Sequence, residues 1–129
     1  MKTILFSFSL LVSVLTISCK KENEVKPQAP EAAAIIDVEY RVACTSGSFV
    51  VDYLAPNSSG TLEMKHDEIS RTEETISFSF KSGNRFVISA SNAIPSHDVI
   101  QVQIYVNGVL KVENSTTNPS QKAVAEGNF

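Results

Sequence analysis

From Ile35 onward, apolar and polar residues alternate along the chain with a period of two. The first such segment places one set of side chains on a single side, namely Ile36, Val38, Tyr40, Val42 and Cys44. Asp37, Glu39 and Arg41 fall on the opposite side. This alternation is typical of a β-strand with one buried face. We therefore predict a strand over Ile35–Cys44, ended by the turn residues Thr45-Ser46-Gly47.

The same alternation recurs in five further segments, which are separated by turn residues and polar runs, namely residues 48–54, 61–66, 75–80, 85–91 and 98–106. Residues 109–113 are expected to be the returning strand of a hairpin, and residues 122–127 are a candidate for a last edge strand. The polar runs at residues 67–74 and 114–121 are expected to be loops. Asn107-Gly108 is a strong hairpin signal, because a type I′ turn needs a positive φ at both central residues. Seven or eight short strands without an amphipathic helix predict an all-β fold, a small antiparallel β-sandwich.

The first 19 residues carry a different pattern, which indicates export. Lys2 precedes an apolar run at residues 4–17, which is shorter than the roughly 20 residues of a membrane-spanning helix. Thr16-Ile17-Ser18 before Cys19 resembles a lipobox. We expect residues 1–18 to be a lipoprotein signal peptide and Cys19 to carry the lipid (palmitate). The alternative is an ordinary secretory signal, which would leave Cys19 free for a disulfide with Cys44.

Residues 19–34 are charged at first and then rich in proline and alanine, without an apolar period. Such a segment cannot bury enough apolar surface to offset its chain entropy, so we predict a flexible tether. The folded domain would then span residues 35–129. The charged residues directly after Cys19 resemble lipoproteins of the Bacteroidota, in which such residues direct export to the cell surface. A merely soluble tether is the alternative interpretation.

Composition limits the classes of partner. Without residues 1–18 the chain keeps ten basic and 14 acidic residues, a net charge of −4. This balance argues against nucleic acid as a partner, because phosphate neutralisation needs a basic surface. It also argues against an electrostatic attraction to anionic lipid, so that the membrane would be reached through the acyl chains on Cys19. Cys44, the other cysteine, is expected to be a small buried residue.

The titratable residues do not form a recognisable catalytic or metal-binding motif. The two histidines, His66 and His97, are each followed by acidic residues, but neighbours on a strand point to opposite faces. Ser96-His97-Asp98 is contiguous, whereas the members of a catalytic triad converge from separate segments. We therefore expect no catalytic residue, no metal site and no cofactor, with both histidines on the surface.

Several strands and turns together resemble the MmpS-type transport accessory proteins. The segments that carry the resemblance are Val38–Val42, Thr45-Ser46-Gly47, Val50–Tyr53, Phe86–Asn92, Val102–Gly108 and Ala123–Gly127. The chain departs from the family at Cys44, where a smaller residue is expected, and in its more charged residues 66–74. The resemblance implies an immunoglobulin-like β-sandwich that assists RND-type exporters. The mycobacterial members are anchored by a transmembrane helix, whereas this chain would be anchored by lipid.

We accordingly expect a non-enzymatic accessory or binding module in the cell envelope. It would be lipid-anchored at the outer membrane, on the periplasmic face or at the cell surface, with an envelope protein or transporter as partner. The alternative is a small envelope hydrolase with an unrecognised site. The expected contact residues are Gln101, Gln103 and Tyr105, because they share the face opposite Ile100, Val102 and Ile104.

Overall fold

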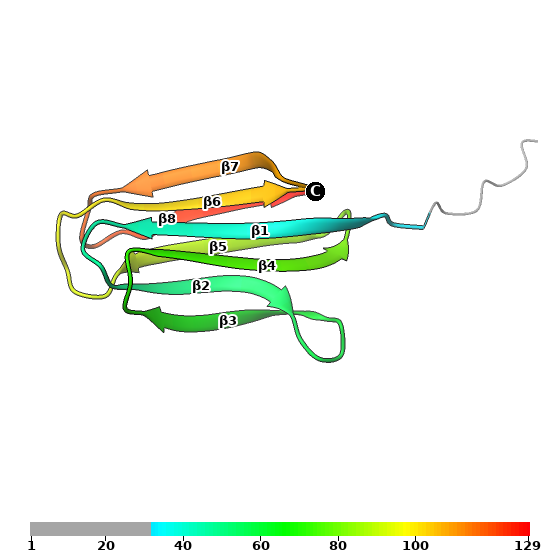
Figure 1. The fold of residues 1–129 in the computed structure, drawn as a ribbon, viewed down its shortest axis with the longest axis horizontal. Coiled ribbons are helices and arrows are strands. Elements are labelled where there is room, and N and C mark those ends of the chain that lie inside the picture. Colours follow the sequence, from blue (N-terminus) through cyan, green and yellow to red (C-terminus); the bar gives the residue numbers. More distant parts are fainter. Residues whose placement is uncertain (1–31) are drawn as a thin grey trace, which may run out of the picture. The chain divides into compact units, whose positions relative to one another are not determined.

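The computed structural model describes residues 32–129, which fold into eight antiparallel β-strands (Figure 1). The strands are β1 (Ile35–Cys44), β2 (Phe49–Pro56), β3 (Leu62–Ile69), β4 (Glu73–Lys81), β5 (Arg85–Asn92), β6 (Ile100–Val106), β7 (Val109–Thr116) and β8 (Ala123–Asn128). Residues 32–129 include no helix that could cross a membrane.

The strands form two four-stranded sheets that pack face to face. One, called the β1 sheet below, has the order β4-β1-β6-β7, and the other, called the β2 sheet, has the order β3-β2-β5-β8. Five of the seven connections pass from one sheet to the other, while β2–β3 and β6–β7 are hairpins within a sheet. The all-β class and the small antiparallel sandwich predicted from the alternation are confirmed.

The core lies between the sheets and is built from the inward set of each alternating strand. Seventeen apolar side chains are buried, and residues 32–129 bury no charged residue. Tyr40 is fully buried at the centre, and its hydroxyl donates a hydrogen bond to the carbonyl oxygen of Leu54 at 2.8 Å. Burial raises the pKa of the Tyr40 phenol well above its usual range. The ring meets Phe78 edge-on, with 5.4 Å between centroids, an arrangement that aromatic pairs favour.

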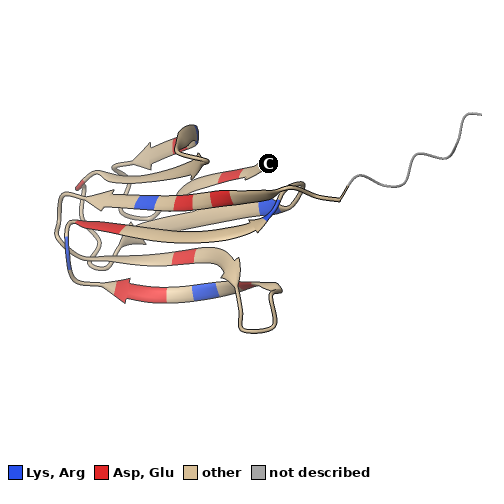
Figure 2. Cartoon of the chain, turned by 45° about the vertical axis from the view of Figure 1, so that its right-hand side comes forward, with Lys and Arg blue, Asp and Glu red and all other residues tan. Residues whose placement is uncertain are grey.

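Both polar runs that we expected to be loops contain strand instead. Residues 67–74 supply the end of β3 and the start of β4, which leaves only three residues between the two strands. Residues 114–116 extend β7. β3 and β7 are edge strands, where water reaches side chains on both faces and a charged segment can still pair through its backbone (Figure 2).

In β3 the polar side of the alternation faces inward. Glu63, Lys65 and Asp67 lie opposite Ala55, Tyr53 and Val51, whose side chains line or border the core. Residues directly opposite in an antiparallel pair share a face, so the three charged side chains point toward the space between the sheets. Met64 lies on the outside and is 57% exposed.

The predicted hairpin at Asn107-Gly108 is confirmed by its backbone angles. Asn107 has φ of 50° and Gly108 has φ of 76°, as a type I′ turn requires. The turn is also attached to β1. Asn107 donates its backbone N–H to the carbonyl of Asp37 at 2.8 Å, and its side-chain oxygen accepts the N–H of Asp37 at 2.9 Å.

The structure describes only part of the predicted domain organisation. β1 begins at Ile35. The signal peptide, Cys19 and residues 19–31 of the expected tether lie outside the described residues.

Candidate functional site

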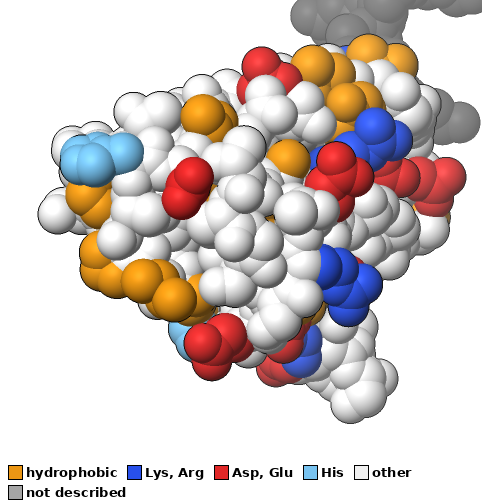
Figure 3. Space-filling view, turned by 60° about the vertical axis from the view of Figure 1, so that its left-hand side comes forward, with side chains coloured by type: hydrophobic (Ala, Val, Ile, Leu, Met, Phe, Trp, Pro, Cys, Tyr) orange, Lys and Arg blue, Asp and Glu red, His pale blue; other side chains and the backbone are white. Residues whose placement is uncertain are grey.

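The two histidines lie on separate parts of the surface (Figure 3). His66 is on the outer side of β3, and His97 is exposed in the connection between β5 and β6. Within residues 32–129 no three His, Cys, Asp or Glu side chains are grouped so that they could hold a metal ion.

His66 belongs to a charged cluster that the sequence analysis did not find. Its Nδ1 lies 2.6 Å from Oδ1 of Asp52, which is directly opposite it on β2. Lys122 reaches the other carboxylate oxygen of Asp52 at 2.6 Å. The hydrogen bonds from Lys122 and then from His66 hold the pKa of Asp52 below its usual range. Only the pairing of β2 with β3 and the position of β8 bring these three residues together.

Cys44 is buried at the end of β1 and is 3% exposed, which confirms the expected buried thiol. Its surroundings are partly polar. The sulfur lies 2.8 Å from Oδ1 of Asn92 and 2.8 Å from Oγ of Ser46. Asn92 in turn donates to the carbonyl of Asp98 at 3.1 Å. These contacts connect β1, β5 and the segment before β6, so their role is structural.

Gln101, Gln103 and Tyr105 do share the outer face of the β1 sheet. They are half-buried and alternate with the fully buried Ile100, Val102 and Ile104. The register places them opposite residues of β1 on the same face, with Ala43 beside Gln101, Arg41 beside Gln103 and Glu39 beside Tyr105.

Arg41 covers one face of Tyr105. The guanidinium carbon lies 4.2 Å from the centre of the ring, within the range of a cation–π interaction. Nε of Arg41 also donates to Oε1 of Glu39 at 2.5 Å, and this hydrogen bond is the main reason why the pKa of Arg41 is raised. The guanidinium therefore stays charged, and half of its side chain is exposed.

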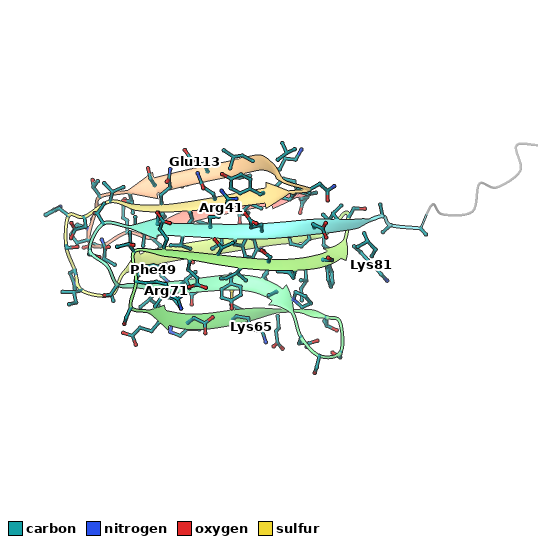
Figure 4. The ribbon with its side chains drawn as sticks, in the orientation of Figure 1. Arg41, Phe49, Lys65, Arg71, Lys81 and Glu113 are labelled. Atoms are coloured by element: carbon teal, nitrogen blue, oxygen red, sulfur yellow. The ribbon has the colours of Figure 1, made fainter. Side chains whose placement is uncertain are left out.

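Tyr105 also begins a short hydrogen-bonded row across β6 and β7. Its hydroxyl donates to Oε1 of Gln103 at 3.4 Å, and Nε2 of Gln103 donates to Oε2 of Glu113 at 2.5 Å. Arg41 and Glu113 enter this face from β1 and β7, on the two sides of β6 (Figure 4). Contacts between side chains of three strands therefore restrain the conformations of four residues, namely Arg41, Tyr105, Gln103 and Glu113.

One shallow hollow adjoins this row, and a second lies beside the first. The first, of about 220 Å³, lies between β6, β1 and β4, and the residues that line it include Arg41, Gln101, Gln103, Thr75 and Glu73. The second, of about 310 Å³, lies at the end of the same strands and shares Gln101 and Glu73 with the first. The outer face of the β1 sheet is thus indented and offers both donors and acceptors. We call the row together with the first hollow the Arg41–Tyr105 face.

Sequence reasoning found three members of this face and missed Arg41 and Glu113. The alternation of residues 98–106 was enough to group Gln101, Gln103 and Tyr105, since residues two apart on a strand share a face. Placing Arg41 over Tyr105 requires knowing that β1 pairs with β6, although the two strands are about 60 residues apart in the chain.

Together, the fold and this face define a small β-sandwich with a polar, aromatic-containing sheet face open to solvent. No protein-family model matches the chain, and no curated protein matches it either.

Proposed function

We propose that this chain is a lipid-anchored, non-enzymatic accessory or binding module of the cell envelope. Acyl chains on Cys19 would hold it at the outer membrane, on the periplasmic face or at the cell surface. The support for this location is the signal pattern of residues 1–19. The resemblance to the MmpS-type proteins supports an envelope protein as partner, with an RND-type transporter as the kind of partner that this family assists.

The observation that carries the proposal is the Arg41–Tyr105 face. Arginine and tyrosine are the residue types that most often supply the binding energy of protein interfaces. Here their side chains are already held by Glu39 and Gln103, so that little conformational entropy is lost when a partner binds. One face of the Tyr105 ring is covered by Arg41, which favours a protein surface over a sugar ring stacked on the aromatic face.

The test is capture of the partner by the tagged full chain after mild cross-linking in intact cells. Tyr105→Ala should reduce the captured envelope protein about tenfold, the loss that corresponds to ~1.4 kcal/mol of binding free energy. The matched control is Val124→Ala, because Val124 is exposed on the outer face of the opposite sheet. This control should capture as much partner as the unchanged chain.

Further experiments test the lipid anchor and the binding role of the protein separately. Cys19→Ala should move the protein from the membrane fraction to the soluble envelope fraction. The proposal of contact without turnover would be overturned if the purified chain hydrolysed an envelope substrate and His66→Ala or His97→Ala abolished that activity. Equal capture by Tyr105→Ala and the unchanged chain would remove the Arg41–Tyr105 face from the proposal.

A further inference from the structure

The sandwich has four edge strands, β4 and β7 in one sheet and β3 and β8 in the other. An edge strand exposes unpaired backbone N–H and C=O groups, to which another strand can pair. Natural sandwiches protect such edges with inward-pointing charges, bulges, prolines or very short strands. The four edges of this protein differ in how far they are protected.

Three edges carry a protective feature. In β3 the charged side chains of Glu63, Lys65 and Asp67 point inward. The pairing of β7 with β6 is irregular at Ile104/Tyr105, and Asn114 of β7 donates to the carbonyl of Val124 in β8 at 2.9 Å. That side-chain bond occupies one backbone acceptor of β8, which is also the shortest strand with six residues.

β4 carries such a feature only at its start, where Glu74 points inward opposite the buried Val42 and pairs with Arg71 at 3.1 Å. Its nine residues, EETISFSFK, pair with β1 in unbroken register and contain no proline, glycine or bulge. The central part, residues 75–80, is uncharged and consists of β-branched, aromatic and serine residues, which favour strand pairing. Ile76, Phe78 and Phe80 point toward the core but remain partly exposed at the open edge.

On the outer face of β4, two charges of opposite sign lie at the two ends of the strand. Glu73 begins the strand and Lys81 ends it, and each is four residues from Ser77 (Figures 2 and 4). Both side chains are exposed on the outer face of the β1 sheet, and neither forms an ion pair with another of the residues 32–129. Each therefore has its charge available for a partner.

We infer that β4 pairs antiparallel with β4 of a second copy of this chain, about a two-fold axis at Ser77. In this register Glu73 of each copy lies opposite Lys81 of the other, which forms two ion pairs from side chains that are otherwise unpaired. A two-fold axis makes the same surface serve on both copies, as in most homodimers. The two β1 sheets become one sheet of eight strands.

Two of the remaining pairs favour this register, whereas Glu74 lies opposite Phe80 of the second copy and keeps its ion pair with Arg71 of its own chain. Thr75 lies opposite Ser79 of the second copy on the outer face, and hydroxyl pairs of this kind stabilise sheets. On the inner face Ile76 lies opposite Phe78, a pairing of β-branched and aromatic side chains that is also favourable. A shift of the axis to Ile76 would instead bring Lys81 opposite Arg71, and like charges at opposite positions are destabilising.

The test is a disulfide cross-link in the full chain, expressed in an oxidising cell envelope and analysed on a non-reducing gel. Ser77→Cys places two thiols opposite each other at the two-fold axis, where opposing Cα atoms lie about 4.5–5.5 Å apart, within disulfide range. Most of this variant should migrate as a dimer. Ser115→Cys is the matched control, an exposed serine on the other edge strand of the same sheet, and should stay monomeric.

Further cysteine and charge variants test the register of the pairing between the two β4 strands. Thr75→Cys alone should give no dimer, because the two thiols would be about 13 Å apart along the strands. Thr75→Cys combined with Ser79→Cys should give a dimer. In the Ser77→Cys background, Glu73→Lys and Lys81→Glu should each lower the dimer yield, and the two together should restore it.

The inference is overturned if Ser77→Cys gives no more dimer than Ser115→Cys. That result would be expected if β4 pairs with a segment of another protein or with none. It is also overturned if Thr75→Cys alone cross-links as well as Ser77→Cys, which would show a different register. Thr75 and Glu73 also line the first hollow, but Ser77 and Ser115 do not, so the comparison of Ser77→Cys with Ser115→Cys is independent of the Tyr105→Ala result.

Discussion

Asp52 lies between two basic side chains on the outer face of the β2 sheet. His66 and Lys122 approach separate oxygens of its carboxylate, and their hydrogen bonds lower its pKa from the ordinary 3.8. A carboxyl group with a lowered pKa in the folded state binds fewer protons there than in the unfolded chain near pH 4. It therefore stabilises the fold above its unfolded pKa, and this contribution is lost as the pH falls through the folded value.

Asp52→Asn should lower the free energy of unfolding at pH 7 by about 1 kcal/mol at most, because the cluster is open to solvent. The difference from the unchanged protein should shrink as the pH is lowered from 5 to 3. Urea denaturation across this range measures it. Glu126→Gln, which breaks the more exposed Arg85–Glu126 pair on the same sheet face, should have a smaller effect at pH 7. A constant difference at every pH would contradict this account of Asp52.

The position of Tyr53 in the fold changes the pKa of its phenol. Its hydroxyl donates to Oδ2 of Asp67 at 2.7 Å, where β2 meets the charged inner side of β3. Partial burial, followed by the hydrogen bond to Asp67 and the negative charge of that carboxylate, raises the pKa of Tyr53 to about 12. The phenol therefore remains a donor at any physiological pH and satisfies one of the inward-pointing carboxylates.

Among the strands and turns, the β6–β7 hairpin depends most directly on its sequence. Gly108 has φ of 76°, which side chains branched at Cβ rarely adopt, and nothing lies within 4 Å of the position where a Cβ would be. Gly108→Val should therefore destabilise the protein through backbone strain alone, by about 1–3 kcal/mol. Gly108→Asn is the control, because asparagine tolerates this conformation. Thermal unfolding followed by circular dichroism would refute the argument if both variants melted at the same temperature.

In β3 and β4 the local pattern of polar and apolar residues is not enough to predict the secondary structure. Residues 67–74 are polar, and a polar run between two alternating segments predicts a loop. The backbone of Asp67 and Glu68 nevertheless pairs with Val51 and Val50, because β3 is held against β2 by its whole length. An edge strand needs fewer apolar side chains than a central one, so its composition approaches that of a loop.

For the molecule as a whole, the eight strands and the core cluster between them are formed by residues 35–129. Ile36 is 8% exposed and pairs with Phe80, so the core reaches almost to the first residue of β1. A chain that begins at Ala32 should therefore unfold at the same temperature as one that begins at Lys20. Removal of residues up to Asp37 should lower the melting temperature by several degrees, because it leaves Phe80 without its neighbour. A lower melting temperature for the chain that begins at Ala32 would show that earlier residues stabilise the domain.

The sequence by itself determined the class of fold, the central strands and the Asn107-Gly108 turn. Period-two alternation reports directly which side of a strand is buried, and a type I′ turn has few permitted residues. It also grouped Gln101, Gln103 and Tyr105, since that grouping needs only the geometry of one strand.

Only the tertiary structure decided which strands are neighbours, and with them every contact that joins distant segments. Arg41 over Tyr105 follows from the pairing of β1 with β6, and Asp52 with His66 and Lys122 follows from the order β3-β2-β5-β8. The open edge of β4 likewise depends on its position outside β1. Alternation is the same for every strand of a sandwich, so it carries no information about which strand lies beside which. That choice is made by the packing of side chains between the sheets.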